Sequence, residues 1–122
     1  MLLFPDAKIN LGLNVIARRP DGYHEIITVM IPVPSTDILE VVPSPDGQDT
    51  LHCSGRPVIC PPESNLVFKA LNKMRRYYDV HAVNVFLNKQ TPDGAGLGGG
   101  SADAAFMLKA LNKLFNLGAT DN

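Results

Sequence analysis

The sequence of 122 residues has no tryptophan, only two cysteines, a formal net charge of −1 and no long apolar run. No stretch approaches the roughly 18 apolar residues of a membrane span, so we expect no membrane-crossing segment. The small net charge gives no sign of attraction to nucleic acid or to an anionic membrane surface. An apolar content of 45% and a charged content of 19% are typical of one globular domain with a hydrophobic core.

The two cysteines, Cys53 and Cys60, lack the spacing of a zinc-binding set. His52 beside Cys53 leaves a metal site open as a minor alternative, but free thiols in a cytoplasmic protein are the better interpretation. The segment 1–6 becomes polar too early for a secretory signal peptide, which also favours a cytoplasmic location. We therefore predict no metal bound by protein side chains alone.

Glycine is concentrated in one segment, Gly94–Gly100, where five of seven residues are glycine. A helix-forming sequence follows directly. Glycine permits backbone angles that a Cβ forbids, so its N–H groups can turn toward a ligand at close range. A helix N-terminus adds unpaired donors and the positive end of a dipole. The segment therefore predicts an anion site, most often for phosphate. A flexible linker is the alternative, but linkers do not usually open into an amphipathic helix.

Two common phosphate loops do not fit this segment. The P-loop pattern requires a lysine that is lacking between Gly94 and Ser101. The spacing of Gly94, Gly96 and Gly99 satisfies the dinucleotide-binding pattern. However, residues 90–93 separate the loop from the expected strand, and no second strand is expected after the helix.

The glycine segment instead resembles the phosphate-binding motif of the superfamily that includes galactokinase, homoserine kinase, mevalonate kinase and phosphomevalonate kinase. The matching residues are Pro92, Gly96, Leu97, Gly98, Ser101, Ala104 and Ala105. The triple glycine before Ser101 is similar to the form found in members that act on a cytidine-diphosphate-linked methylerythritol. Three further segments resemble the same branch in the same order: 7–11, 18–24 and 65–67.

Residue periodicity predicts several strands and two helices. The expected strands are 9–15, half-buried, then 24–33, ended by Pro32 and Pro34, then 38–42, 50–54 and 83–88. A turn is expected at 18–22, and Asp46-Gly47 predicts a hairpin between 38–42 and 50–54. One helix should follow Ser64 or Asn65 as N-cap, and another should run from about 101 to 116, with Leu108 on its buried face and Gly118 as its C-cap. The resemblance implies an α+β domain with helices on one face of a sheet, related to a ribosomal-protein domain.

The resemblance also implies that the chain binds ATP together with Mg²⁺. The positions implied for the nucleotide are Asn65, Lys89, Pro92, Gly94, Ala95, Gly96, Leu97, Gly98, Gly99, Gly100 and Ser101. A solvated strand-end lysine remains the alternative for Lys89, and a helix N-cap is the alternative for Ser101. Ala102 replaces a second serine that the family often has, which puts a metal role for this position in doubt. Asp103 is expected in the first helical turn, where it would complement the helix dipole.

Four residues near the start of the chain are implied to bind or activate the second substrate. By resemblance, Lys8 contacts the substrate hydroxyl beside a catalytic aspartate, although its position in a strand alone also suits an edge charge. Asn10, two residues on, should lie on the same sheet face. By resemblance Tyr23 stacks on cytosine and His24 hydrogen-bonds its edge. A turn aromatic and an exposed histidine are the alternatives.

The catalytic aspartate of the resembled family belongs to a Gly-Ala-Asp-Val-Pro type of segment that lies beyond residue 122. Residues 119–122 are typical of an N-cap and a first helical turn. We therefore expect residues 1–122 to be the N-terminal, ATP-binding domain of a longer kinase, inactive without the second domain. A homoserine- or mevalonate-type kinase is one alternative, and a non-catalytic nucleotide-binding domain is another. The sequence leaves the oligomeric state open.

Overall fold

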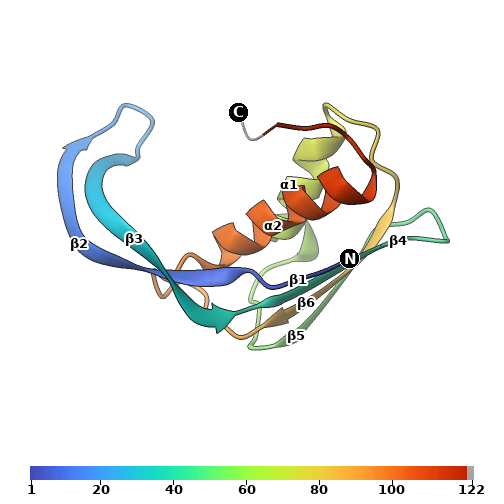
Figure 1. Ribbon diagram of the computed structural model, residues 1–122, viewed down its shortest axis with the longest axis horizontal. Helices are drawn as coiled ribbons and strands as arrows, with labels where there is room; N and C mark the ends of the chain where they lie inside the picture. The colour runs from blue at the N-terminus through green and yellow to red at the C-terminus, as the bar shows by residue number, and fades with distance from the viewer. Residues whose placement is uncertain (121–122) are drawn as a thin grey trace.

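The computed structural model describes residues 1–120 as two sheets and two main helices (Figure 1). The larger sheet has the strand order β1-β4-β6-β5, and the smaller one pairs β2 with β3. The strands are β1 Leu2–Leu3, β2 Asp6–Arg18, β3 His24–Thr36, β4 Ile38–Pro43, β5 Thr50–Gly55 and β6 Val83–Lys89. The helices are the short 3-10 turn η1 Pro62–Ser64, α1 Leu66–Arg75 and α2 Gly99–Leu114.

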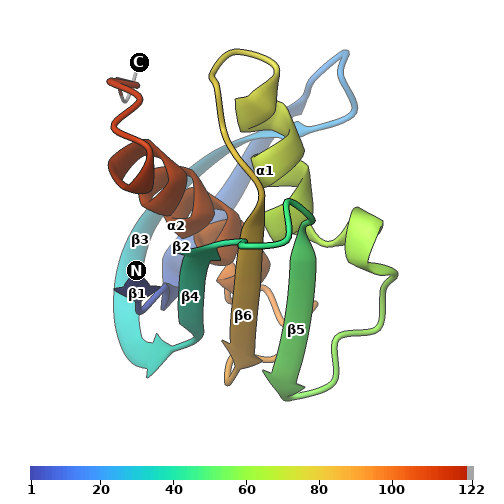
Figure 2. The same ribbon diagram turned by 90° about the vertical axis from the view of Figure 1, so that its right-hand side faces the viewer.

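Both long helices cover one face of the four-stranded sheet (Figure 2). Burial alternates along β6, where Val83, Val85 and Leu87 lie in the core. Leu71 of α1 and Leu111 of α2 belong to the same buried cluster. The predicted α+β fold, with helices on one face of a sheet, is confirmed.

The predicted hairpin between residues 38–42 and 50–54 is wrong. Both strands form, but β6 lies between them, antiparallel to β4 and parallel to β5. The turn at Asp46-Gly47 carries the chain past the end of β6, and Gly47 has the positive φ of 69° that this bend requires. A local turn signal cannot reveal that a strand from later in the chain takes the central place. That choice depends on burying the apolar face of β6 under both helices.

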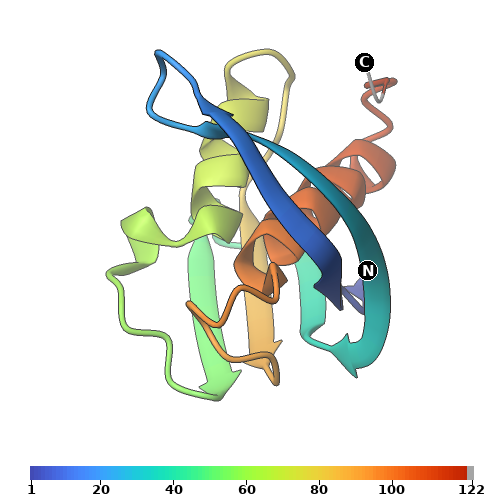
Figure 3. The same cartoon turned by 90° about the vertical axis from the view of Figure 1, so that its left-hand side faces the viewer.

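β2 and β3 form a long antiparallel hairpin that curves away from the larger sheet (Figures 1 and 3). Pro32 and Pro34 lie inside β3, so the prediction that they end the strand is wrong. A strand in a two-stranded ribbon has a free edge, where a missing N–H is tolerated. The expected half-burial of residues 9–15 is also wrong, since Leu11, Leu13 and Val15 are all more than half exposed. The predicted turn is confirmed, with the Gly22 amide donating to the Arg19 carbonyl at 3.1 Å.

The helix ends follow local capping chemistry. Asn65 is the N-cap of α1, as predicted, and its side-chain oxygen accepts from the Val67 amide at 2.9 Å. α2 begins two residues earlier than expected. Its C-cap is Phe115, and the left-handed residue that directly follows is Asn116, so Gly118, also left-handed, lies too far along to cap the helix as predicted. The Leu117 amide donates to the Asn112 carbonyl at 3.0 Å.

Two further expectations concern the C-terminal third of the chain. Leu108 was expected on the buried face of α2 but is 38% exposed. The helical turn predicted for 119–122 includes residues 121 and 122, which lie outside the described residues. Among residues 1–120, neither long helix has the length and apolar character needed to cross a bilayer.

Candidate functional site

The glycine segment folds into an irregular loop that joins β6 to α2. Gly94, Gly96 and Gly98 have φ values of 73°, 73° and 70°, alternating with residues of ordinary negative φ. Alternation of this kind turns successive backbone N–H groups toward one side, as in anion-binding nests. Gly98 is the N-cap of α2 and supplies no side-chain hydrogen bond, so the first amides of the helix keep their donor capacity.

A cleft of about 340 Å³ opens between this loop and the segment that leads into α1. Ten of the eleven positions predicted to bind nucleotide line it: Asn65, Lys89, Pro92, Gly94, Gly96, Leu97, Gly98, Gly99, Gly100 and Ser101. Ala95 does not line the cleft. The opposite wall includes Val58, Cys60 and Ser64. The fold thus gathers positions that lie far apart in sequence, while their contacts with a nucleotide stay a prediction.

Ser101 and Asn65 face the cleft in different ways. Ser101 is the third residue of α2 and is exposed, so the N-cap alternative for it is wrong. Its hydroxyl is free to meet a ligand at the helix N-terminus. Asn65 is 8% exposed and uses its side-chain oxygen as the cap of α1, which leaves its amide nitrogen as the group available to a ligand.

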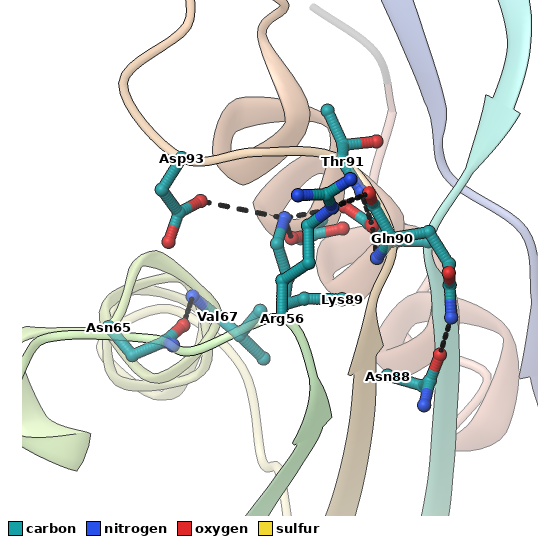
Figure 4. A network of polar contacts seen from close by, with 10 residues as sticks. Arg56, Asn65, Val67, Asn88, Lys89, Gln90, Thr91 and Asp93 are labelled. Atoms are coloured by element: carbon teal, nitrogen blue, oxygen red, sulfur yellow. Dashed lines mark hydrogen bonds and ion pairs between the residues drawn. The ribbon is translucent and has the colours of Figure 1, made fainter.

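Lys89 is the last residue of β6 and is only 2% exposed, so the solvated-lysine alternative is wrong. Its Nζ donates to Asp37 Oδ2 at 2.5 Å and to Asp103 Oδ2 at 2.8 Å, and lies 3.7 Å from Asp93 Oδ1 (Figure 4). Burial lowers the pKa of Lys89, but the bonds to Asp103 and Asp37 outweigh burial and raise it. Lys89 is therefore a cation, and buried carboxylates already balance its charge.

The two carboxylates that hold Lys89 differ in their surroundings. Burial raises the pKa of Asp37, but bonds from Lys89 and from the Thr91 and Gln90 amides outweigh it, and the net pKa is lowered. Burial also raises the pKa of Asp103, and here the pKa reaches about 6 despite the bond from Lys89. Asp103 lies in the second turn of α2, not the first, because the helix begins at Gly99. Within residues 1–120, its Oδ1 has no hydrogen-bond partner.

Lys8 lies directly against the glycine loop. Its Nζ donates to Asn10 Oδ1 at 2.6 Å and to the Gly96 carbonyl at 2.7 Å, and its backbone amide donates to the Leu97 carbonyl at 2.8 Å. A Cβ added to Gly98 would stand 3.0 Å from Lys8 Cε. The predicted shared face of Lys8 and Asn10 is confirmed, and both lie beside the loop.

Tyr23 and His24 lie at the other end of the hairpin, at the turn between β2 and β3 (Figure 3). Tyr23 is 74% exposed, and its amide donates to Asp21 Oδ1 at 3.1 Å. The structure therefore does not bring this pair together with Lys8 and the loop. Their proposed role with cytosine stays a prediction.

Asp37 is a site residue that the sequence analysis missed. It is completely buried and holds both Lys89 and the backbone that leads into the glycine loop. A weak signal exists, since a lone acid between the β-rich runs 24–36 and 38–43 has no obvious place in a strand. Within residues 1–120, no three His, Cys, Asp or Glu side chains gather in a way that could hold a metal ion.

Comparison with known proteins places this geometry in a family. A model of the GHMP kinases N terminal domain matches residues 65–122. A curated protein of Bacteroides fragilis named 4-diphosphocytidyl-2-C-methyl-D-erythritol kinase is 50% identical over 99% of this chain and 45% of its own length. A protein of the same name from Parabacteroides distasonis is 52% identical over 96% of this chain and 42% of its own length. The chain thus spans less than half the length of these relatives.

Solved structures agree with the sequence relatives. A crystal structure of 4-(cytidine 5'-diphospho)-2C-methyl-D-erythritol kinase is 38% identical, with a TM-score of 0.78 over 98% of this chain and 42% of that one. Mevalonate pyrophosphate decarboxylase from Streptococcus pyogenes, 15% identical, shares the fold with a TM-score of 0.70 over 98% of this chain and 39% of that one. The chain has a glycine loop that opens into α2 and relatives along nearly its whole length, and it has the N-terminal domain fold of the GHMP kinases.

Proposed function

We propose that this chain is the N-terminal, ATP-binding part of a longer kinase that phosphorylates 4-diphosphocytidyl-2-C-methyl-D-erythritol on a hydroxyl group. Such a reaction belongs to non-mevalonate isoprenoid synthesis, in the cytoplasm. The observation that carries the proposal is the loop of alternating positive-φ glycines that caps α2 and forms one wall of the cleft. The names of relatives about 50% identical supply the substrate.

In this proposal the phosphates of ATP lie against the N–H groups of the glycine loop and the first turn of α2. Backbone donors fixed by glycine stabilise negative charge without having to reorganise when the reaction occurs. Ser101 adds a hydroxyl at the same helix end. The purine and ribose would lie toward Asn65 and Cys60, on the wall of the cleft opposite the glycine loop.

The transfer requires a hydroxyl oxygen to attack the γ-phosphorus while the bond to the β,γ-bridging oxygen breaks and ADP leaves. Lys8 is placed at the loop, where its ammonium can hold the attacking oxygen and offset charge on the moving phosphoryl group. The proton of the hydroxyl would pass to the family's catalytic aspartate, which we place in the part of the polypeptide beyond residue 122. Lys8 has no acceptor lone pair while protonated, so it cannot itself take that proton.

Mg²⁺ fits this site as an ion carried mainly by phosphate oxygens. Magnesium in phosphoryl-transfer sites commonly keeps several waters and uses one or two protein oxygens. The exposed Ser101 hydroxyl and the half-exposed Asp93 carboxylate both line the cleft and can serve as such ligands. When bound, the ion would neutralise charge on the phosphates.

The hairpin would carry the other end of the substrate. Midway between Lys8 and Tyr23, a hollow of about 390 Å³ is lined by residues 11–14 and 27–29. The Thr28 hydroxyl there is buried and has no partner within the described residues. The curve of the hairpin brings its tip closer to its base through space than along the strand (Figure 1). A long substrate could therefore lie along the curve, with cytosine against Tyr23 and His24.

The test is ADP release by the complete polypeptide with ATP, Mg²⁺ and the cytidyl substrate, measured beside homoserine and mevalonate. We expect the complete polypeptide to release ADP with the cytidyl substrate but not with homoserine or mevalonate. The isolated 122-residue chain should release none with any of the three. The Lys8→Met variant should lower kcat roughly 100-fold, because it removes a charge needed in the transition state. The KM for ATP should change little, because the bond from the backbone amide of residue 8 to the Leu97 carbonyl still holds the loop. Lys69→Met, on the exposed side of α1, is the matched control. Binding of ATP without any phosphorylation would favour the non-catalytic alternative.

A further inference from the structure

The glycine loop is fixed at its first residues by a carboxylate from another part of the fold. Asp37 lies at the junction of β3 and β4, and none of it is exposed. Its Oδ1 accepts from the Gln90 amide at 2.6 Å and from the Thr91 amide at 2.8 Å. Its Oδ2 accepts from Lys89 Nζ at 2.5 Å. One side chain therefore holds three consecutive residues at the point where β6 ends and the loop begins.

The same carboxylate also lies against the end of the loop. A Cβ at Gly99 would stand 2.9 Å from Thr91 Cγ2 and 3.3 Å from Asp37 Oδ2. Thr91 and Gly99, the first residues on either side of the loop, thus lie next to each other, and both lie next to the Asp37 carboxylate. The spacing between the end of β6 and the start of α2 is set at this contact, where there is no room for a side chain on Gly99.

Asp37 is in turn tied to the base of the hairpin. Its backbone amide donates to the Pro5 carbonyl at 3.0 Å, three residues before Lys8. Lys8 holds the far side of the loop through the carbonyls of Gly96 and Leu97. The loop is therefore held at two points by one connected piece of structure, at its ends by Asp37 and near its tip by Lys8.

We infer that Asp37 is a positioning residue for nucleotide binding: its bonds to the Gln90 and Thr91 amides fix the loop in the conformation that meets the phosphates. Asp37 does not line the cleft, so it acts through the backbone and not by touching the ligand. This inference rests on the proposed function, since the loop is taken to bind ATP. Misplacing a group at a reaction site by about 1 Å can cost on the order of 100-fold in rate, and we expect a displaced phosphate loop to lose nucleotide affinity by a comparable factor.

A second carboxylate offers a matched control at the opposite end of β6. Asp49 accepts from the Val83 amide at 3.0 Å, where β6 begins, and is ion-paired with Arg75 of α1. The Arg75 bond holds the pKa of Asp49 below its usual value against an opposing effect of burial. Asp49 therefore has the same chemistry as Asp37, a cation and a strand-end amide, but lies away from the loop.

The experiment measures the affinity of the complete polypeptide for a non-hydrolysable ATP analogue with Mg²⁺ by calorimetry, beside a thermal melt of each variant. Asp37→Ala should weaken binding about 10- to 100-fold while the protein is folded. Asp37→Asn keeps an oxygen for the two amides but turns an NH2 group, which cannot accept, toward Lys89 Nζ. It should bind within about 3-fold of the wild type, because it loses the charge and the Lys89 bond but keeps the two positioning bonds. Asp49→Ala should lower the melting temperature and leave the affinity within about 2-fold.

The outcomes separate this inference from the proposed function. Failure of the wild type to bind the analogue overturns the proposed function, and with it the role of Asp37. Wild-type binding with an unchanged affinity in Asp37→Ala overturns the inference alone. Equal losses in the Asn and Ala variants also overturn it, because the charge and the Lys89 bond, and not the amide bonds, would then matter. Should Asp37→Ala not fold, Asp37→Ser replaces it, since its hydroxyl is on a shorter side chain and cannot occupy the position of Asp37 Oδ1, which accepts from both amides.

Discussion

The two sheets of this domain use apolar residues in opposite ways. In the four-stranded sheet, Val41, Val85 and Leu87 are almost completely buried under two helices. In the hairpin, Leu13, Val15 and Ile27 are each more than half exposed. Both regions contain β-branched and aliphatic residues in similar density, so composition does not distinguish them. What differs is that helices cover one face of the first sheet, while within residues 1–120 nothing covers either face of most of the second.

This difference indicates which region stabilises the fold and which region is a surface for binding or for contact with another domain. A two-stranded ribbon is marginally stable in water unless another layer packs against it. Contiguous exposed apolar surface is commonly a binding or interdomain surface. We propose that substrate and the remaining part of the longer polypeptide cover the hairpin. The larger sheet and its helices would then be the rigid support, and the hairpin the surface that becomes buried on assembly.

The largest expected effect compares one leucine from each region. Leu111→Ala removes a side chain with no exposed surface and should lower the free energy of unfolding by about 2–5 kcal/mol. Leu13→Ala, at a residue 58% exposed, should change it by less than about 0.5 kcal/mol in the 122-residue chain. Urea denaturation followed by circular dichroism measures both.

The same two variants, measured in the complete polypeptide, test whether the hairpin is covered there. There Leu13→Ala should become clearly destabilising, because the hairpin would be covered. Equal effects of Leu13→Ala in the short and complete chains would contradict a covered hairpin.

The next prediction concerns nucleotide affinity and Gly98, the loop residue that lies against Lys8 of the hairpin. Gly98→Val introduces a β-branched residue at φ 70°, with its Cβ against Lys8, and should weaken binding of an ATP analogue roughly 100-fold. Calorimetric titration beside a thermal melt measures affinity and stability separately. Gly47→Val is the control, because Gly47 has nearly the same φ, 69°, with nothing within 4 Å of the added Cβ. Unchanged affinity in folded Gly98→Val would exclude the glycine loop as a phosphate site.

The smallest effect concerns a charge buried inside the rigid region. The pKa of Asp103 is raised from 3.8 to about 6, so the folded state binds more protons than the unfolded state between these values. Stability should therefore increase as the pH falls from 7 to about 5, by on the order of 1 kcal/mol. Asp103→Asn should remove this increase, while Asp46→Asn, in an exposed turn, should keep it. Thermal melts across this pH range provide the test, and an identical pH profile in Asp103→Asn would count against the assignment.

The sequence predicts local features of this domain well and long-range ones poorly. The Asn65 cap, the turn after Arg18 and the period of β6 depend on neighbouring residues, and all three are confirmed. The central position of β6, by contrast, follows from burial against both helices. Pro32 and Pro34 seemed to end a strand because the free edge of β3 was not known. In each case the missing information was which surface lies next to the residue.

The site shows the same division. The glycine-rich segment and the helix after it predict an anion-binding loop, and the resemblance implies that Lys8 contacts the substrate hydroxyl. The contact of Lys8 with the loop itself was not predicted and comes from the structure. The pairing of Lys89 with Asp37 and Asp103 was not predicted, because the three residues are separated by up to 66 positions in sequence. Lysine at a strand end is usually exposed. Only the meeting of three elements at the end of β6 shows that it is buried.

The prolines of β3 also bear on how this domain avoids self-association. Pro32 and Pro34 are two residues apart, so their backbone nitrogens face the same edge of the strand, and neither can donate a hydrogen bond. Prolines in sheets favour edges with no partner strand. The register of β2 is irregular between Leu11 and Leu13 and between Val15 and Ala17. These irregularities disturb the regular spacing of hydrogen-bonding groups along the outer edge of β2. A ribbon so rich in exposed aliphatic residues would otherwise be a template for cross-β aggregation.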